Sequence, residues 1–176
     1  MTVTTSAKTR QMVQAALCTA LLCVISPWSV VIGPVSLTLG VFGVFFAGAM
    51  LTPGYACLAV TAYIALGAMG LPVISNFRSG PAAVFGPTGG YLLAFPAMAL
   101  LLSLAKKHSR SLWLQAVAIG AALMVMYALG TAWFMAVTGT GLAASLAACV
   151  LPFVLPDAAK GAAALALSAA LRRRMQ

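Results

Sequence analysis

The chain has 176 residues, of which 63% are hydrophobic and only 6% are charged. A soluble domain usually carries about 25% charged residues, so this composition excludes an ordinary soluble enzyme or nucleic-acid-binding domain despite the net charge of +9. A membrane-spanning helix needs about 20 apolar residues, and the chain is therefore long enough for about six short spans with little left for loops.

Turn residues divide the apolar sequence into six runs. The first break, 27–34, holds two prolines and a glycine, the second is Pro53-Gly54, and the longest connection is 71–87. We therefore expect an all-α integral membrane protein that forms a single domain, 1–176, as a bundle of six transmembrane helices. The predicted spans are 11–31, 35–52, 54–70, 88–105, 112–138 and 144–171.

Basic residues cluster in three places: before the first span, after the fourth span and after the sixth. With six spans, all three clusters lie on one side of the membrane, which the positive-inside rule assigns to the cytoplasm. Both chain ends are therefore expected to be cytoplasmic, in a multi-pass protein of the cell membrane. The clusters consist of Lys8 and Arg10, of Lys106, Lys107 and Arg110, and of Arg172, Arg173 and Arg174.

The first predicted span carries small residues four positions apart. Ala16 and Ala20 form one such step, and Ala15 and Thr19 form a parallel one. Small residues at this spacing let helix backbones approach closely within a membrane. The pattern indicates either close packing inside the bundle or a docking face for another membrane subunit.

The outward connection 71–87 and the start of the fourth span hold polar groups suited to closing over a ligand. Asn76 offers amide donors and a carbonyl acceptor, Arg78 a planar cation, and Tyr91 an aromatic ring with a hydroxyl group. Arg78 is the only cation expected on the outward side. The alternative is an ordinary loop in which Arg78 faces water or lipid phosphate.

The sixth predicted span contains Asp157, which is the only acidic residue of the chain, and Lys160 three residues later. This spacing places both side chains on one helix face. A charge near the middle of a bilayer costs at least about 2.5 to 3.5 kcal/mol, so such residues usually face a cavity or a partner. Nearby Pro152 and Pro156 predict an irregular start to this helix, where a cavity can open. The pair is a candidate binding site, and the alternative is a purely structural ion pair.

The sequence predicts no enzyme, no cofactor and no bound metal. It has no nucleotide-binding motif and no catalytic triad, and one acid is too few for most acid/base chemistry. The single histidine, His108, lies in a predicted cytoplasmic turn, and the four cysteines show no metal-ligand spacing. Binding or transport of a solute remains.

Four stretches, taken in order, resemble the BioY family, which comprises the biotin-capturing S components of energy-coupling-factor (ECF) transporters. They are GPVSLTL at 33–39, LGAMGLPV at 66–73, GPTGGY at 86–91 and DAAK at 157–160. The resemblance covers nearly the whole chain, including its length, the expected span count and the topology. It implies a six-helix substrate-binding membrane subunit whose site opens outward beneath a lid formed partly by the loop between spans three and four.

The resemblance also implies a ligand and a set of binding residues. Biotin would be bound by Asn76, Asp157 and Lys160, which match polar positions of the family's site, with Arg78 and Tyr91 beside them. Its ureido ring presents two N–H donors and a carbonyl, and its tail ends in a carboxylate, which suits these residue types.

The implied partners are a transmembrane coupling subunit and two cytoplasmic ATPase subunits, within membrane lipid. The Ala16 and Ala20 step resembles the face by which S components meet the coupling subunit. Three other readings stay open: an S component for another vitamin, a stand-alone solute facilitator in which Asp157 and Lys160 line the conducting path, and a structural subunit that binds no ligand.

Overall fold

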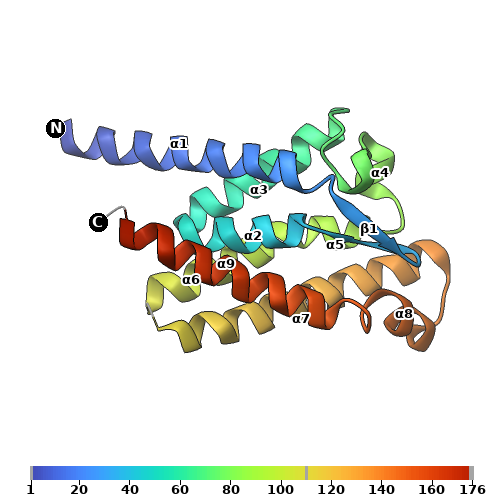
Figure 1. Ribbon diagram of the computed structural model, residues 1–176. Coiled ribbons are helices and arrows are strands. Elements are labelled where there is room, and N and C mark those ends of the chain that lie inside the picture. Colours follow the sequence, from blue (N-terminus) through green and yellow to red (C-terminus); the bar gives the residue numbers. More distant parts are fainter. Residues whose placement is uncertain (1, 110, 175–176) are drawn as a thin grey trace.

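Figure 1 shows a computed structural model of the chain, which describes residues 2–109 and 111–174. The described residues form a helical bundle with a short two-stranded antiparallel sheet at one end. In chain order the elements are α1 (Thr2–Ile25), β1 (Ser29–Ile32), β2 (Val35–Thr38), α2 (Gly40–Met50), α3 (Pro53–Ala68), the 3-10 turn η1 (Ser75–Phe77), α4 (Pro81–Phe85), α5 (Gly89–Leu93), α6 (Phe95–His108), α7 (Leu112–Thr138), α8 (Leu142–Cys149) and α9 (Val154–Arg174).

Helix α2 lies in the middle of the bundle and is buried along almost its whole length. It packs against α1, α3, α6 and α9, which explains why its residues are apolar on every side rather than on one face. Small residues permit these close contacts. A side chain at Gly48 would lie 2.9 Å from the carbonyl oxygen of Ala99 on α6, so only glycine lets the two backbones approach this closely.

Three described helical stretches are long and apolar enough to cross a membrane: Gly89–His108, which joins α5 and α6, Leu112–Thr138 and Val154–Leu171. The shorter helices α2 and α3 are apolar as well. The fold is thus the predicted helical membrane bundle, while the exact count of six spans stays a prediction.

The prediction of helix for the whole of 11–31 and 35–52 was wrong at the ends where these two spans meet. The first helix ends at Ile25 and α2 begins only at Gly40, because 29–38 forms the β1–β2 hairpin with Val31 paired to Ser36. The local signal for this hairpin is a β-branched run, a Gly-Pro turn and then alternating apolar and hydroxyl residues. An apolar run of this length does not distinguish a strand from a helix by hydropathy alone.

The last predicted span, 144–171, is also not one helix. It is divided into α8 and α9 by a turn at 150–153 that contains Pro152, which has no backbone N–H to continue a helix. Pro156 falls in the first turn of α9, where its missing donor disrupts no helical hydrogen bond. The irregular start predicted for this helix is therefore confirmed. The long connection 71–87 contains α4, a further departure from the prediction.

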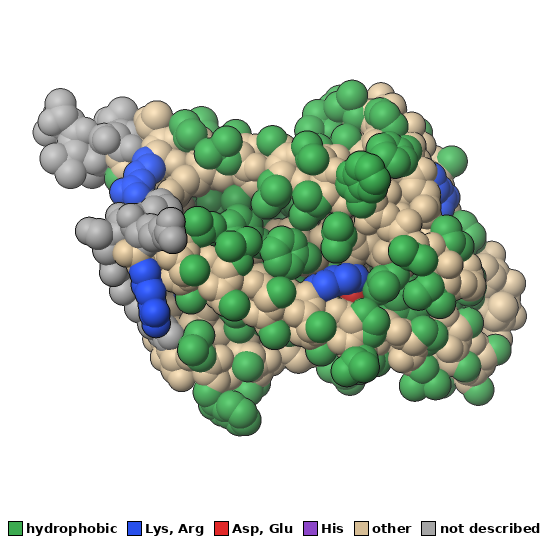
Figure 2. Space-filling model, in the orientation of Figure 1, with side chains coloured by type: hydrophobic (Ala, Val, Ile, Leu, Met, Phe, Trp, Pro, Cys, Tyr) green, Lys and Arg blue, Asp and Glu red, His purple; other side chains and the backbone are tan. Residues whose placement is uncertain are grey.

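The two described chain ends and the α6–α7 turn lie at the same end of the bundle, and the hairpin and α4 lie at the other (Figure 1). Lysine and arginine side chains are visible at the first of these ends (Figure 2), which is the cytoplasmic end by the positive-inside rule. Arg110 lies outside the described residues, as do the side chains of Arg172 and Arg174.

Candidate functional site

Asp157 and Lys160 form a buried ion pair near the start of α9. The Lys160 Nζ lies 2.9 Å from the Asp157 Oδ1, and the Asp157 residue is only 3% exposed. Tyr127 of α7 donates its hydroxyl to the other carboxylate oxygen, Oδ2, at 2.9 Å. The predicted proximity of the pair is confirmed, and both carboxylate oxygens have a donor, as a buried charge requires.

The lysine of this pair also joins α9 to the hairpin. Its Nζ donates to the backbone carbonyl of Thr38 at 2.8 Å, at the end of β2. The Thr38 hydroxyl in turn donates to the Ser26 carbonyl at 2.7 Å and accepts from the Gly40 N–H at 2.9 Å. Lys160 and Thr38 together thus link α9 to the end of α1, the hairpin and the start of α2 beside the carboxylate.

Two small adjoining cavities lie between the hairpin and the helices. The outer cavity, of about 70 Å³, is lined by residues of the hairpin, of the 74–78 loop and of α5. The inner cavity, of about 50 Å³, is lined by α7 and by the α8–α9 region and includes Asp157. Both cavities are lined by Val35, Ser36, Thr38, Tyr91 and Phe95, so these five residues form the wall between them.

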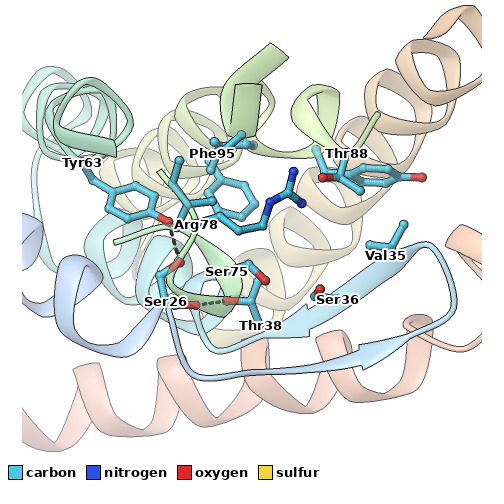
Figure 3. A pocket seen from close by; sticks show the side chains of 13 residues that line it. Ser26, Val35, Ser36, Thr38, Tyr63, Ser75, Arg78, Thr88 and Phe95 are labelled. Atoms are coloured by element: carbon cyan, nitrogen blue, oxygen red, sulfur yellow. Dashed lines mark hydrogen bonds between the residues drawn. The ribbon is translucent and has the colours of Figure 1, made fainter. Parts of the chain in front are cut away.

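Arg78 lies at the outer cavity, as Figure 3 shows, with its side chain passing Phe95 and its guanidinium directed toward Thr88. Among the described residues its side chain makes no ion pair and no hydrogen bond of its own. The only acid of the chain is already bound to Lys160. Arg78 is therefore an uncompensated cation at a cavity, which favours an anionic ligand group there.

Tyr91 lies in the wall between the cavities and is 8% exposed. Its hydroxyl lies 3.1 Å from the hydroxyl of Thr131 on α7, which orients the ring. Glycine at position 130 is required by this arrangement, because a side chain there would overlap the Tyr91 ring at 2.2 Å. Tyr91 lines both cavities, so it is placed to contact a ligand in either one.

Asn76 is placed differently from the other predicted site residues. Its side-chain Nδ2 donates to the Ser36 hydroxyl at 2.7 Å, and its backbone N–H donates to the Ser29 hydroxyl at 2.9 Å. It does not line either cavity. Its backbone φ is +58°, a left-handed conformation that asparagine tolerates better than most residues. The structure thus places Asn76 where it fastens the 74–78 loop onto the hairpin.

This placement predicts that Asn76→Ala loosens the loop. The variant loses the hydrogen bond to Ser36. It also places alanine in the left-handed region, where a β-carbon is unfavourable and alanine has no polar side chain to compensate. The two effects together destabilise the closed loop by about 2 kcal/mol. Amide hydrogen exchange of 74–80 should become at least about tenfold faster. Asn76→Gly, which loses the bond but not the backbone preference, should show a smaller increase. Unchanged exchange in the alanine variant would argue against a fastening role.

The two small-residue steps of α1 face different ways. Ala15 is buried and the Thr19 hydroxyl donates to the Ala59 carbonyl of α3 at 2.9 Å, so this step packs inside the bundle. Ala16 and Ala20 are exposed. Sequence spacing alone did not distinguish the two steps. Only the step of Ala16 and Ala20 is exposed and available to another subunit.

Several site residues were not predicted from the sequence. Tyr127, Thr38 and Phe153 come from three different segments and meet at the inner cavity. Thr38 contributes to the ion pair through its carbonyl group, which has no side-chain signature. Ser26 is buried, and its hydroxyl is bonded to that of Tyr63. The local signal was the stretch GPVSLTL at 33–39, which contains Thr38 and three further residues that line the inner cavity, Val35, Ser36 and Leu37.

The chain is similar to known proteins in both sequence and fold. A family model described as "BioY family" matches residues 1–176. A solved structure is described as the S-component for biotin from an ECF-type ABC transporter. The match covers 98% of this chain and 95% of that chain, with 25% sequence identity and a TM-score of 0.87. The chain belongs to the BioY family.

Curated relatives agree with this assignment. A Pyrococcus horikoshii protein named "Probable biotin transporter BioY" is 39% identical over 165 residues, which is 94% of this chain and 98% of that protein. A Thermotoga maritima protein named "Biotin transporter BioY" is 45% identical over 123 residues, 69% of this chain and 72% of that one. Membership of the BioY family makes the chain a multi-pass transport protein of the plasma membrane and not an enzyme.

Proposed function

We propose that this chain captures biotin from outside the cell as the substrate-binding membrane subunit of an ECF-type transporter. The observation that carries the proposal is the pair of cavities, with an uncompensated arginine at the outer one and Asp157, neutralised by Lys160, at the inner one. The names of the relatives and of the matching structure support biotin as the ligand.

The charges of the two cavities suggest how biotin lies. Its carboxylate needs a cation that is not already neutralised, and Arg78 meets that requirement while Lys160 is bound to Asp157. The neutral ureido group suits the inner cavity, because Asp157 and the Tyr127 hydroxyl supply an acceptor and a polar group there. Lys160 can donate to the ureido carbonyl, and Tyr91 can pack against the bicyclic ring between the two ends.

Binding in this orientation requires the wall between the cavities to open. The two volumes, about 70 and 50 Å³, are well below the ~300 Å³ at the lower end of usual ligand sites. The 74–78 loop is joined to the hairpin by side-chain hydrogen bonds of Asn76 and Ser75. We propose that this loop and the hairpin act as the lid, and that Asn76 contributes to binding by holding the lid closed.

The proposed partners are a transmembrane coupling subunit and two cytoplasmic ATPase subunits. The exposed step of Ala16 and Ala20 on α1 is a suitable contact for the coupling subunit, because small exposed residues permit close helix approach in a membrane. The opposite face of α1 is already occupied by α3 through the Thr19 hydrogen bond.

The experiment that tests the ligand is titration calorimetry on the purified chain in detergent. We expect one biotin per chain, competition by desthiobiotin, which keeps the ureido unit, and at least about tenfold weaker competition by a fatty acid of similar length. The fatty acid leaves the buried polar groups of the inner cavity without partners, at a cost of about 1–3 kcal/mol. Equal competition by the two compounds would contradict the ureido site. Binding of a different vitamin in place of biotin would show that the chain is an S component for that vitamin.

A further inference from the structure

A groove of about 500 Å³ lies between α7 and α9, separate from the two cavities of the site. Its lining consists only of alanine, glycine, leucine and isoleucine residues, and none of them lines the outer or the inner cavity. Ile119, Leu123 and Leu165 are buried and form its floor. Exposed small residues such as Gly120 and Ala162 form its walls.

The dimensions of the groove match one leaflet of a membrane. On α7 its lining runs from Leu112 to Leu123, and on α9 from Ala158 to Ala169. Eleven helical steps of about 1.5 Å give a length of about 16 Å, close to half of the ~30 Å hydrocarbon core. The end of the groove at Leu112 and Ala169 is the end nearer to the α6–α7 turn and to the C-terminal end of α9. The groove therefore lies at the depth of the cytoplasmic leaflet.

Positive charge lies beyond that same end. Arg173 is exposed and comes four residues after Ala169, which places it on the same face of α9 one turn farther on. Lys107 is exposed at the end of α6, five residues before Leu112. The only acidic residue of the chain is buried against Lys160 at the far end of α9, so no acidic side chain balances these two cations.

We propose that the α7–α9 groove binds one acyl chain of an anionic phospholipid of the cytoplasmic leaflet, with the phosphate between Arg173 and Lys107. Basic residues between transmembrane helices on the cytoplasmic side are the usual recognition elements for anionic headgroups. A helix of a partner protein or of a second copy would fill the groove but leave both cations without an anion. Charge complementarity therefore favours the lipid.

Native mass spectrometry of the purified full-length chain tests this proposal, with phosphatidylglycerol and phosphatidylcholine added at equal concentration. We expect preferential retention of one phosphatidylglycerol per chain. The double variant Lys107→Gln with Arg173→Gln should lower that retention by roughly fivefold per charge removed. Gly120→Leu should abolish it, because the new side chain fills the groove. Apart from its chain neighbours and the nearby backbone of α7, no protein atom lies within 4 Å of a β-carbon at this position, so the fold should tolerate the change.

Ala121→Leu is the matched control, since Ala121 is exposed on α7 but does not line the groove. It should retain phosphatidylglycerol like the unaltered chain. Thermal unfolding and biotin titration of all variants check that each is folded, independently of lipid retention. Equal retention of the two lipids, or unchanged retention in Gly120→Leu, would overturn the proposal. A change of oligomeric state in Gly120→Leu without selective lipid retention would overturn it in favour of contact between two copies.

Discussion

Asp157→Ala is expected to abolish measurable biotin binding and to lower the stability of the chain. The substitution leaves Lys160 and the Tyr127 hydroxyl without the carboxylate that they both contact at 2.9 Å. Removing one partner of a buried ion pair costs about 3–5 kcal/mol, mainly because the other charge stays buried. Thermal unfolding in detergent measures the stability, and titration calorimetry measures the affinity.

A second set of variants separates a binding role from a structural one. Asp157→Leu combined with Lys160→Met removes both charges, so it should recover much of the lost stability while binding stays absent. Asp157→Asn keeps an acceptor for Tyr127 and should lower biotin affinity by about tenfold or more, or at least 1.4 kcal/mol. If the double variant bound biotin as tightly as the unaltered chain, the pair would be structural only.

Arg78→Ala is expected to weaken biotin binding by about 10- to 100-fold, because a charge-assisted hydrogen bond to the carboxylate contributes about 1.5–3 kcal/mol. The stability of the chain should change little, since the side chain makes no ion pair within the described residues. Titration calorimetry with biotin and with biotin amide, which lacks the carboxylate charge, tests the proposed orientation. The amide should bind the variant and the unaltered chain alike.

Lys107→Ala is the matched control for this comparison, because Lys107 is an exposed cation at the opposite end of the bundle. It should leave the affinity for both compounds unchanged. An equal loss of biotin and biotin amide in Arg78→Ala would show that Arg78 holds the lid rather than the carboxylate.

Much of the site was predictable because its main charges are close in sequence. Asp157 and Lys160 are three residues apart on one helix, so helical geometry alone brings them together, and a charged residue in an apolar run has few alternatives to a partner or cavity. Arg78 stood out as the single outward cation. The function of Asn76 was not predictable, because its hydrogen bond reaches 40 residues back to Ser36.

Composition and the spacing of charges determined that the chain crosses a membrane, which end is cytoplasmic, and where its one buried ion pair lies. These properties depend on the solvent and on neighbours within one or two helical turns. Only the tertiary structure decided that 29–38 is a hairpin, that Thr38 and Tyr127 complete the ion pair, and that Ala16 rather than Ala15 faces outward. Those outcomes depend on packing between segments far apart in the chain, and side-chain patterns within a single segment do not encode which neighbour each face will meet.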